Sequence, residues 1–311
     1  MKNGSAGGID AEPPLRPMKM HDGELDIDPE LVGRLVATQF PHLSGLPIEE
    51  VRSTGTVNAI FRIGDDLYAR LPRMETWAED LRREWRWLPQ LSPHLSLPVP
   101  VPVSLGWPDD TYPFFWAIYA WIAGRPYADD LVHDEQVAAE DLARFVLELR
   151  RVDPAGAPRA GRRPLRELDA VTRDAIRSAR GLIDGEAALE AWDRALEAPA
   201  WAGTPVWIHT DLLRPNVLVR AGRIGAVIDF GGAGIGDPAA DVIAAWSVFG
   251  SAGRSTFRGA LEVDDGTWNR ARGFALHQAA VIIPYYSDTN PDFAASAQRT
   301  VGEVLADIRL G

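Results

Sequence analysis

The spacing of apolar residues divides the chain into a strand-rich first part and a helix-rich second part. Leu31 and Leu35 predict a short amphipathic helix that begins near Asp28-Pro29. Residues 48–72 place apolar runs on both sides of the turn signal Gly64-Asp65-Asp66, which predicts a β-meander. The chain therefore begins its fold with one helix and a small antiparallel sheet.

Residues 75–91 form the clearest helical stripe. Four large apolar side chains share one face of this helix: Trp77, Leu81, Leu88 and Leu91. Glu84 falls on the same stripe, and a carboxylate on a face that packs into a core is costly unless it is paired. The pattern leaves two possibilities, a cation beside Glu84 or a rim position from which the carboxylate reaches water.

Two extended segments follow, and then mostly helices. The proline-rich run 97–108 predicts an edge strand or a linker, because proline cannot donate to a central ladder. Residues 114–124 predict a buried strand that ends at Gly124, where the lobe changes. The remaining predicted elements are helices over 134–151, 165–180 and 186–198, a hairpin within 205–230 that turns at Ala221-Gly222, and helices from Asp237 onward.

This order of elements predicts an α+β fold with a small β-rich N-lobe and a larger, mainly helical C-lobe. We expect a flexible N-terminal extension over 1–27, the N-lobe over 28–123 and the C-lobe over 124–311.

Composition narrows the class of partner. The 311 residues include 32 Lys and Arg against 44 Asp and Glu, a net charge of −12, which argues against a nucleic-acid or anionic-membrane partner. The absence of cysteine excludes disulfides, thiol catalysis and Cys-based metal sites. Because the chain has neither a signal-peptide core nor about 18 consecutive apolar residues, we expect a cytoplasmic protein with no membrane span.

Three polar residues at the edges of apolar strands carry the candidate chemistry. Asp211 and Asn216 flank a proline-containing loop, and the predicted hairpin returns Asp229 to the neighbourhood of Asn216. A carboxylate and an amide oxygen suit a hard cation such as Mg²⁺, and a further carboxylate can accept a proton from a hydroxyl group. These are the parts that phosphoryl transfer requires.

The pattern His209-x-Asp211-x-x-x-x-Asn216, followed by Asp229-Phe230-Gly231, resembles the paired motifs of the aminoglycoside phosphotransferase family, relatives of the protein kinases. The resemblance extends over about residues 28–310 and includes the phrases NAIFRIGDDLYARLPR, LPVPVPVSLGWP and IIPYYSDTNP. It implies a protein-kinase-like fold of two lobes.

The resemblance also implies a role for each motif residue. Asp211 would be the catalytic base that faces the substrate hydroxyl, and Asn216 and Asp229 would hold the Mg²⁺ that bridges the phosphates of ATP or GTP. His209 would orient the catalytic loop, and Asp241 would hydrogen-bond backbone groups in the same region.

The N-lobe phrase implies the nucleotide site. Arg70 stands where the family has the cation that grips the α- and β-phosphates, and Glu84 stands where its helix carboxylate pairs with that cation. The further nucleotide-binding positions are Ser53, Thr54 and Gly55 in the phosphate-covering loop, and Tyr119, Trp121 and Ile122 in the linker beside the base. For acceptor contacts we expect Trp246, Tyr285, Tyr286 and Asp288.

Three departures from the family pattern stand in this sequence. Arg70 replaces the usual lysine, and its forked guanidinium is not interchangeable with an ammonium group. Thr210 replaces a glycine, although a residue with a Cβ is strained at positive φ. Arg214 lies in a loop that commonly reads His-Pro-Gly, where it would either assist at the phosphates or point to solvent.

The expected activity is Mg-dependent transfer of the γ-phosphoryl group of ATP or GTP to a hydroxyl of a small molecule, an aminoglycoside, a macrolide or another hydroxylated antibiotic. The alternatives are a kinase of choline, homoserine or methylthioribose type, a nucleotide-binding pseudokinase, which Arg70 and Thr210 would favour, and a metal-dependent hydrolase. The acceptor, the choice of nucleotide and the oligomeric state stay open.

Overall fold

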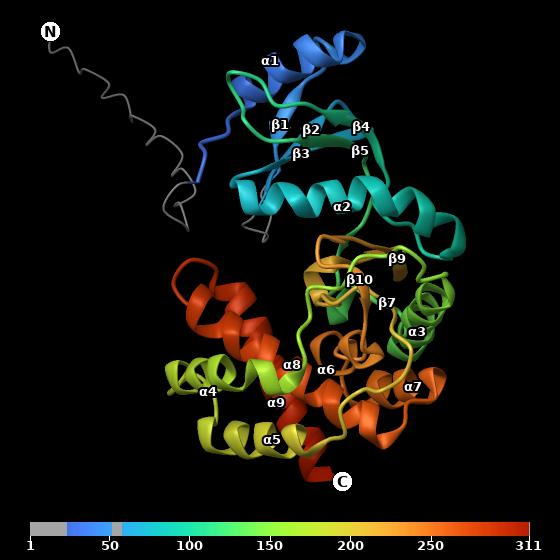
Figure 1. The fold of residues 1–311 in the computed structure, drawn as a ribbon, viewed down its shortest axis with the longest axis vertical. Coiled ribbons are helices and arrows are strands. Elements are labelled where there is room, and N and C mark those ends of the chain that lie inside the picture. Colours follow the sequence, from blue (N-terminus) through green and yellow to red (C-terminus); the bar gives the residue numbers. More distant parts are fainter. Residues whose placement is uncertain (1–23, 52–57, 311) are drawn as a thin grey trace, which may run out of the picture.

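The computed structural model describes residues 24–51 and 58–310 of the chain. Figure 1 shows a strand-rich lobe with two long helices above a larger lobe built mainly of helices. The α+β architecture of two lobes is the one that the order of apolar patterns predicts.

The N-lobe is an antiparallel sheet in the order β1-β2-β3-β5-β4. Its strands are β1 (Ile48–Glu50), β2 (Asn58–Ile63), β3 (Leu67–Pro72), β4 (Pro102–Gly106) and β5 (Trp116–Ala120). The proline-rich segment supplies β4 at an edge of the sheet, as predicted, because its prolines cannot donate to a ladder on both sides. β5 is shorter than the predicted strand 114–124.

Helix α1 (Pro29–Gln39) covers one face of this sheet. Asp28 caps it by accepting the Leu31 N–H at 2.7 Å, so the predicted start is confirmed. Ile27 is also buried, and the Leu25 N–H donates to the Arg73 carbonyl at 3.0 Å. Residues 24–27 are therefore part of the fold, and the other residues of the expected 1–27 extension, 1–23, lie outside the described residues.

Helix α2 (Glu75–Leu91) covers the other face, and this helix is where the two lobes meet (Figure 1). Leu81 packs against Ala117 and Tyr119 of β5, while Ile118 between them faces α1. The alternation along β5 therefore gives the sheet two apolar faces, one for each helix. The same packing turns Glu84 inward, where it is 1% exposed.

The C-lobe contains helices and two small sheets. Its helices are α3 (Glu135–Arg151), α4 (Asp169–Ser178), α5 (Gly185–Glu197), α6 (Ala244–Ser247), α7 (Ser251–Leu261), α8 (Asp265–Tyr286) and α9 (Pro291–Leu310). Its strands are β6 (Arg125–Pro126), β7 (Val206–Ile208), β8 (Val217–Arg220), β9 (Arg223–Val227) and β10 (Gly234–Gly236). They pair as β6-β8-β9 and β10-β7, so the chain changes lobe between β5 and β6.

The β8–β9 hairpin is the C-lobe element that matters most for the site. Its two turn residues both have positive φ, 50° at Ala221 and 78° at Gly222, which is the geometry of a tight hairpin turn. The predicted hairpin and turn are confirmed. The hairpin returns the end of β9 to the start of β8, where the Ile228 N–H donates to the Asn216 carbonyl at 2.9 Å.

Helix α8 runs through the middle of the helical lobe and packs against α4, α5 and α9. Its buried face carries large side chains such as Trp268, Phe274 and Ile283. None of the described helices is long and apolar enough to cross a membrane.

His277 of α8 lies in this helical core. Its Nδ1 is 2.8 Å from the Thr172 hydroxyl of α4, and its ring faces Trp192 of α5 at 6.4 Å between centroids. Burial, together with the nearby charges of Arg162 and Arg163, lowers the pKa of His277 to about 4. The folded protein therefore keeps this imidazole neutral at a pH where the unfolded chain protonates it.

His277→Gln should flatten the dependence of stability on pH. Between pH 6.5 and about 4 the unfolded chain binds a proton that the folded chain does not, so the free energy of unfolding falls as the pH falls. Across this window the wild type should lose about 2 kcal/mol more than the variant. Urea denaturation at pH 7 and pH 4.5 measures the difference, and equal losses in the two proteins would contradict the assignment.

Candidate active site

The loop between β7 and β8 carries the first motif, and His209 fixes its shape. The His209 ring is fully buried, its Nδ1 accepts the Asp211 N–H at 3.2 Å, and its Nε2 lies 3.1 Å from the Ile228 carbonyl. Because Nδ1 accepts, Nε2 carries the proton and donates to that carbonyl. Both ring nitrogens are therefore used to tie the loop to the segment that precedes Asp229.

Asp241 holds the same loop through two backbone N–H groups. Its fully buried carboxylate accepts the N–H of His209 at 2.9 Å and the N–H of Thr210 at 2.8 Å. Burial raises the pKa of Asp241, and His209 together with these backbone N–H groups opposes that rise. The contacts of Asp241 and His209 are those of residues that position the loop.

Two residues of the site have backbone conformations that favour glycine. Thr210 has a φ of 77° and Asp229 a φ of 68°. Such values cost about 1 kcal/mol or more at a residue with a Cβ, and they persist only where surrounding contacts impose them. Thr210 is held on both sides, since its N–H donates to Asp241 and its carbonyl accepts from Arg162 at 2.5 Å. Thr210 therefore adopts a strained backbone conformation at a position where the family pattern has glycine.

Asp211 stands at the centre of the site, with a hydrogen-bond donor at each carboxylate oxygen. The Asn216 side-chain amide donates to Oδ2 at 2.6 Å, and the Gln278 amide of α8 donates to Oδ1. Burial and the nearby Asp229 raise the pKa of Asp211, while the electrostatic effects of His209 and Arg162 and the hydrogen bond from Gln278 oppose the rise. The geometry leaves Asp211 oriented by neighbours on two different elements.

Gln278 and Arg162 are site residues that sequence reasoning missed. Arg162 donates to the Gln278 side-chain oxygen at 2.6 Å and so links the loop before α4 to Asp211. The sequence feature that could have identified Gln278 is that it is the only amide side chain in the mainly apolar run 274–283 of α8. Arg162 lies in a loop with several arginines, and nothing in its spacing distinguishes it from Arg163.

Arg70 forms a buried ion cluster between β3, α2 and the end of β9. Its NH1 donates to both Glu84 oxygens at 2.7 and 2.8 Å, and its NH2 donates to Asp229 Oδ1 at 2.9 Å. The Tyr119 hydroxyl donates to Glu84 at 2.9 Å. Of the two possibilities for Glu84, the buried and paired one is correct, and the solvated rim position is wrong.

The Arg70 guanidinium directs every N–H at a protein oxygen. With its side-chain oxygen turned toward Arg70, the Asn58 amide accepts from Nε and from NH2 at 2.9 Å each. Glu84 and Asp229 accept the remaining donors. A phosphate oxygen can therefore reach this cation only where Asp229 or Asn58 gives up its place.

Asn216 and Asp229 provide the donor set for a cation. The Asn216 amide nitrogen faces Asp211, which leaves its oxygen for another partner, and the Asp229 side chain is 41% exposed. Among the described residues no cluster of three His, Cys, Asp or Glu side chains has the arrangement of a metal site. Two hard oxygen ligands fit Mg²⁺, which commonly keeps waters and phosphates as its other ligands.

The other predicted nucleotide positions are distributed around this cluster. Ser53, Thr54 and Gly55 lie outside the described residues. Trp121 and Ile122 form the half-buried connection between the lobes, where the Trp121 N–H donates to the Asp66 carbonyl at 2.7 Å. The Tyr119 side chain points into the ion cluster, so only its backbone borders that connection.

Two expectations are corrected. Trp246 is fully buried against Trp268, with 4.4 Å between ring centroids, so it belongs to the core and does not line an acceptor cleft. Arg214 reaches neither phosphates nor open solvent, because it donates to the Val248 carbonyl at 3.0 Å and pairs with Asp129 at 2.6 Å.

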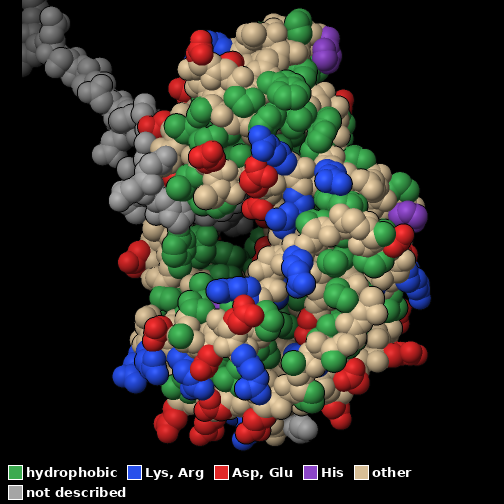
Figure 2. Space-filling model, viewed as in Figure 1, with side chains coloured by type: hydrophobic (Ala, Val, Ile, Leu, Met, Phe, Trp, Pro, Cys, Tyr) green, Lys and Arg blue, Asp and Glu red, His purple; other side chains and the backbone are tan. Residues whose placement is uncertain are grey.

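The remaining candidates for acceptor contacts lie at the end of α8. Tyr285 and Tyr286 pack edge to face, with 4.6 Å between centroids, and Asp288 is exposed just beyond the helix. Figure 2 shows a hollow between the two lobes, with hydrophobic and charged side chains around it.

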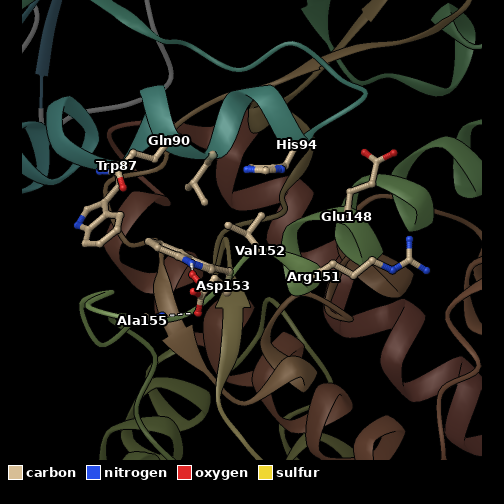
Figure 3. Close-up of a pocket in the computed structure, with 10 residues that line it drawn as sticks. Trp87, Gln90, His94, Glu148, Arg151, Val152, Asp153 and Ala155 are labelled. Carbon is tan, nitrogen blue, oxygen red and sulfur yellow. Dashed lines mark hydrogen bonds between the residues drawn. The ribbon is translucent and has the colours of Figure 1, made fainter.

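A cavity of about 560 Å³ lies elsewhere, between the end of α2 and the end of α3 (Figure 3). Trp87 and Trp207 meet there at 5.2 Å between ring centroids, with Arg151 and Glu148 at the rim. None of the residues predicted for the site lines it, so this cavity is separate from the chemistry.

The sequence matches one family model and one curated relative. Residues 49–274 match the model of the phosphotransferase enzyme family. One curated relative, the protein YcbJ of Bacillus subtilis (strain 168), is 28% identical over 138 residues, which are 42% of this chain and 43% of that protein. The sequence match thus spans less than half the length of this relative.

Solved structures share the fold over about nine-tenths of this chain. The GDP complex of wild-type aminoglycoside 2′-phosphotransferase-IIIa has a TM-score of 0.69 and 20% identity, with 91% of this chain and 100% of that chain covered. Macrolide 2′-phosphotransferase MphH from Brachybacterium faecium has a TM-score of 0.56 and 23% identity, with 89% and 97% covered. The predicted kinase-like fold is confirmed.

The buried ion cluster predicts that loss of Arg70 on β3 lowers stability more than loss of an exposed ion pair on α2. Arg70→Met leaves the Glu84 carboxylate buried without its cation and should lower the free energy of unfolding by about 3–5 kcal/mol. Arg70→Met combined with Glu84→Gln removes the uncompensated charge, keeps an acceptor for Tyr119, and should recover part of that loss.

The exposed pair Arg82–Glu79 on the same helix is the matched control. Glu79→Ala should change stability by less than about 0.5 kcal/mol. Urea denaturation of the four proteins measures these effects. If Arg70→Met lowers the free energy of unfolding no more than Glu79→Ala does, the buried cluster does not stabilise the fold.

Proposed function

The chain belongs to the phosphotransferase enzyme family, and from this premise we propose that it is a Mg-dependent kinase of small molecules. It transfers the γ-phosphoryl group of ATP or GTP to a hydroxyl group of its acceptor. The observation that carries the proposal is the meeting of Asp211, Asn216 and Asp229, from two separate motifs, beside the buried Arg70–Glu84 pair. A base, a pair of oxygen ligands and a cation are the parts that this reaction needs.

The acceptor we propose is a hydroxylated antibiotic of the aminoglycoside or macrolide type. Support comes from the aminoglycoside and macrolide phosphotransferases that share the fold. Kinases of choline, homoserine or methylthioribose type stay as the alternative, because the same base and ligands would serve any hydroxyl acceptor.

Asp211 acts on the acceptor. Its carboxylate aligns the hydroxyl and takes its proton while the oxygen forms a bond to the γ-phosphorus, and the bond from that phosphorus to the β-phosphate oxygen breaks. His209 and Asp241 keep the loop in place during the reaction, since both hold its backbone. Proper alignment of base and hydroxyl accounts for much of the rate that such a site can provide.

Asn216 and Asp229 would hold the metal, and Mg²⁺ would supply positive charge that stabilises the phosphates during transfer. Asp229 is also the carboxylate that accepts from Arg70 NH2, and this N–H is the one that Arg70 would offer to a phosphate oxygen in place of that contact. Arg70 keeps its two bonds to Glu84 throughout, so the guanidinium stays oriented.

The two departures that favour a pseudokinase do not prevent the site from assembling. Thr210 adopts the positive φ that a glycine would adopt, and Arg70 pairs with Glu84 as a lysine would. Both observations support an active enzyme over a protein that only binds nucleotide.

Asp211→Asn should lower kcat for acceptor phosphorylation by about 10²–10⁴-fold and leave nucleotide binding unchanged, because the amide cannot accept the hydroxyl proton. The assay presents ATP or GTP with a panel of aminoglycosides, macrolides, choline, homoserine and methylthioribose, and detects the phosphorylated product by mass spectrometry. Wild-type turnover in the variant would remove Asp211 from the role of base. Transfer to no member of the panel would contradict the acceptor class.

Asp229→Asn should weaken Mg-dependent nucleotide binding and abolish turnover. The amide oxygen can still accept from Arg70, so the loss isolates the missing ligand charge from the loss of the ion cluster. Calorimetric titration of ADP with and without Mg²⁺ measures it. Asp265→Asn on the outer end of α8 is the control, and an equal effect of both variants would exclude Asp229 as a metal ligand.

A further inference from the structure

The Gln278 side chain bridges a cation and the candidate base, and its orientation is determined by chemistry. Arg162 has only N–H donors, so the atom of Gln278 that faces Arg162 at 2.6 Å is the side-chain oxygen. The amide nitrogen of Gln278 therefore faces Asp211, where it donates to Oδ1. Arg162 in turn is held by the Thr210 carbonyl at 2.5 Å, within the same loop as Asp211.

The two donors on Asp211 differ in how easily they can leave. Asn216 lies five residues further along the same loop, is 9% exposed, and also donates to the Asp211 carbonyl at 2.9 Å. Gln278 belongs to α8, is half-buried, and touches Asp211 through one bond only. The donor that an incoming hydroxyl group displaces more easily is therefore the Gln278 amide on Oδ1.

Gln278 also stands on the acceptor side of the site. It comes from the helical lobe, whereas Arg70 and Glu84 on the nucleotide side come from the N-lobe sheet and α2. Beside it is a narrow cavity of about 10 Å³ between α6, α8 and α9, lined mainly by apolar side chains, with the hydroxyls of Ser247, Ser296 and Thr300. A cavity of this size holds about one water molecule and no acceptor.

From this geometry we infer that Gln278 is a positioning residue that latches Asp211 when no acceptor is bound. Its amide fills one acceptor direction of Oδ1 and makes that oxygen a weaker base, so a water molecule that enters the site beside a bound nucleotide loses its proton less readily. The hydroxyl group of an acceptor bound between the lobes displaces the Gln278 amide and donates to Asp211 Oδ1 in its place. The latch would suppress transfer of the phosphoryl group to water, and it rests on the proposed function.

The test uses water as the only acceptor. Gln278→Met keeps the length of the side chain and cannot donate. It should raise kcat for hydrolysis of ATP or GTP about tenfold without acceptor, which corresponds to the loss of a bond worth about 1.4 kcal/mol. The KM for the nucleotide should stay within about twofold, because Gln278 faces the acceptor side. Phosphate release under saturating Mg²⁺ measures both.

Three further proteins separate a latch from a structural effect. Val281→Ala, on the exposed face of the same helix, should hydrolyse nucleotide at the wild-type rate. Gln278→Glu keeps a partner for Arg162 but, when ionised, has no proton to donate to Asp211, so it should raise hydrolysis as Gln278→Met does. Asp211→Asn combined with Gln278→Met should abolish the rise, because the released oxygen is then no longer a base.

Several outcomes would overturn the latch. They are a fall or no change in hydrolysis in both Gln278 variants, an equal rise in Val281→Ala, and a rise that survives Asp211→Asn. If wild type phosphorylates an acceptor while neither Gln278 variant hydrolyses more nucleotide, the latch is wrong and the proposed function stands. If no acceptor is phosphorylated although Gln278→Met raises hydrolysis through Asp211, the acceptor class is wrong and the latch stands.

Discussion

The buried guanidinium of Arg70 is the interaction on which the arrangement of the lobes depends. It joins β3 to Glu84 of α2 and to Asp229, which follows β9 more than a hundred residues later. Burial alone would lower the pKa of Arg70, but the two carboxylates raise it well above its ordinary range. A charge removed from water is costly to leave unpaired, so sheet, helix and C-lobe loop are stable together in one relative position. The same position brings Arg70 and Glu84 against Asp229, one of the two proposed metal ligands.

The catalytic loop has its own constraint, which is backbone strain. Thr210 and Asp229 both adopt positive φ, and His209, Asp241 and Arg162 supply the hydrogen bonds that hold the Thr210 loop. Strain of this kind persists only where the surroundings determine the conformation more than once. The consequence is that the two carboxylate oxygens of Asp211, the proposed base, point in defined directions. One faces Asn216 within the loop and the other faces a side chain of the helical lobe.

Much of the fold could be read from local patterns. The alternation in β2 and β3, the proline-rich edge strand, the helical stripe of α2 and the turn at Ala221 each follow from residues close in sequence.

Trp246 shows where prediction from local patterns fails. A large aromatic residue after the metal segment suits a cleft as well as a core, and only the position of Trp268 on α8 decides that it is buried. Arg214 fails in the same way, since its partners Val248 and Asp129 lie far along the chain.

The sequence by itself determined which chemical groups the site contains and their order, because the spacing of Asp211, Asn216 and Asp229 around a hairpin is a local property. It also indicated that Glu84, on an apolar helix face, needs either a cation or a path to water. Only the tertiary structure decided that Arg70 neutralises Glu84 and that Gln278 reaches Asp211 from 67 residues away. The physical reason is that hydrogen bonds and ion pairs act over a few ångströms, whereas the residues that form them are joined by loops and helices whose packing no short pattern encodes.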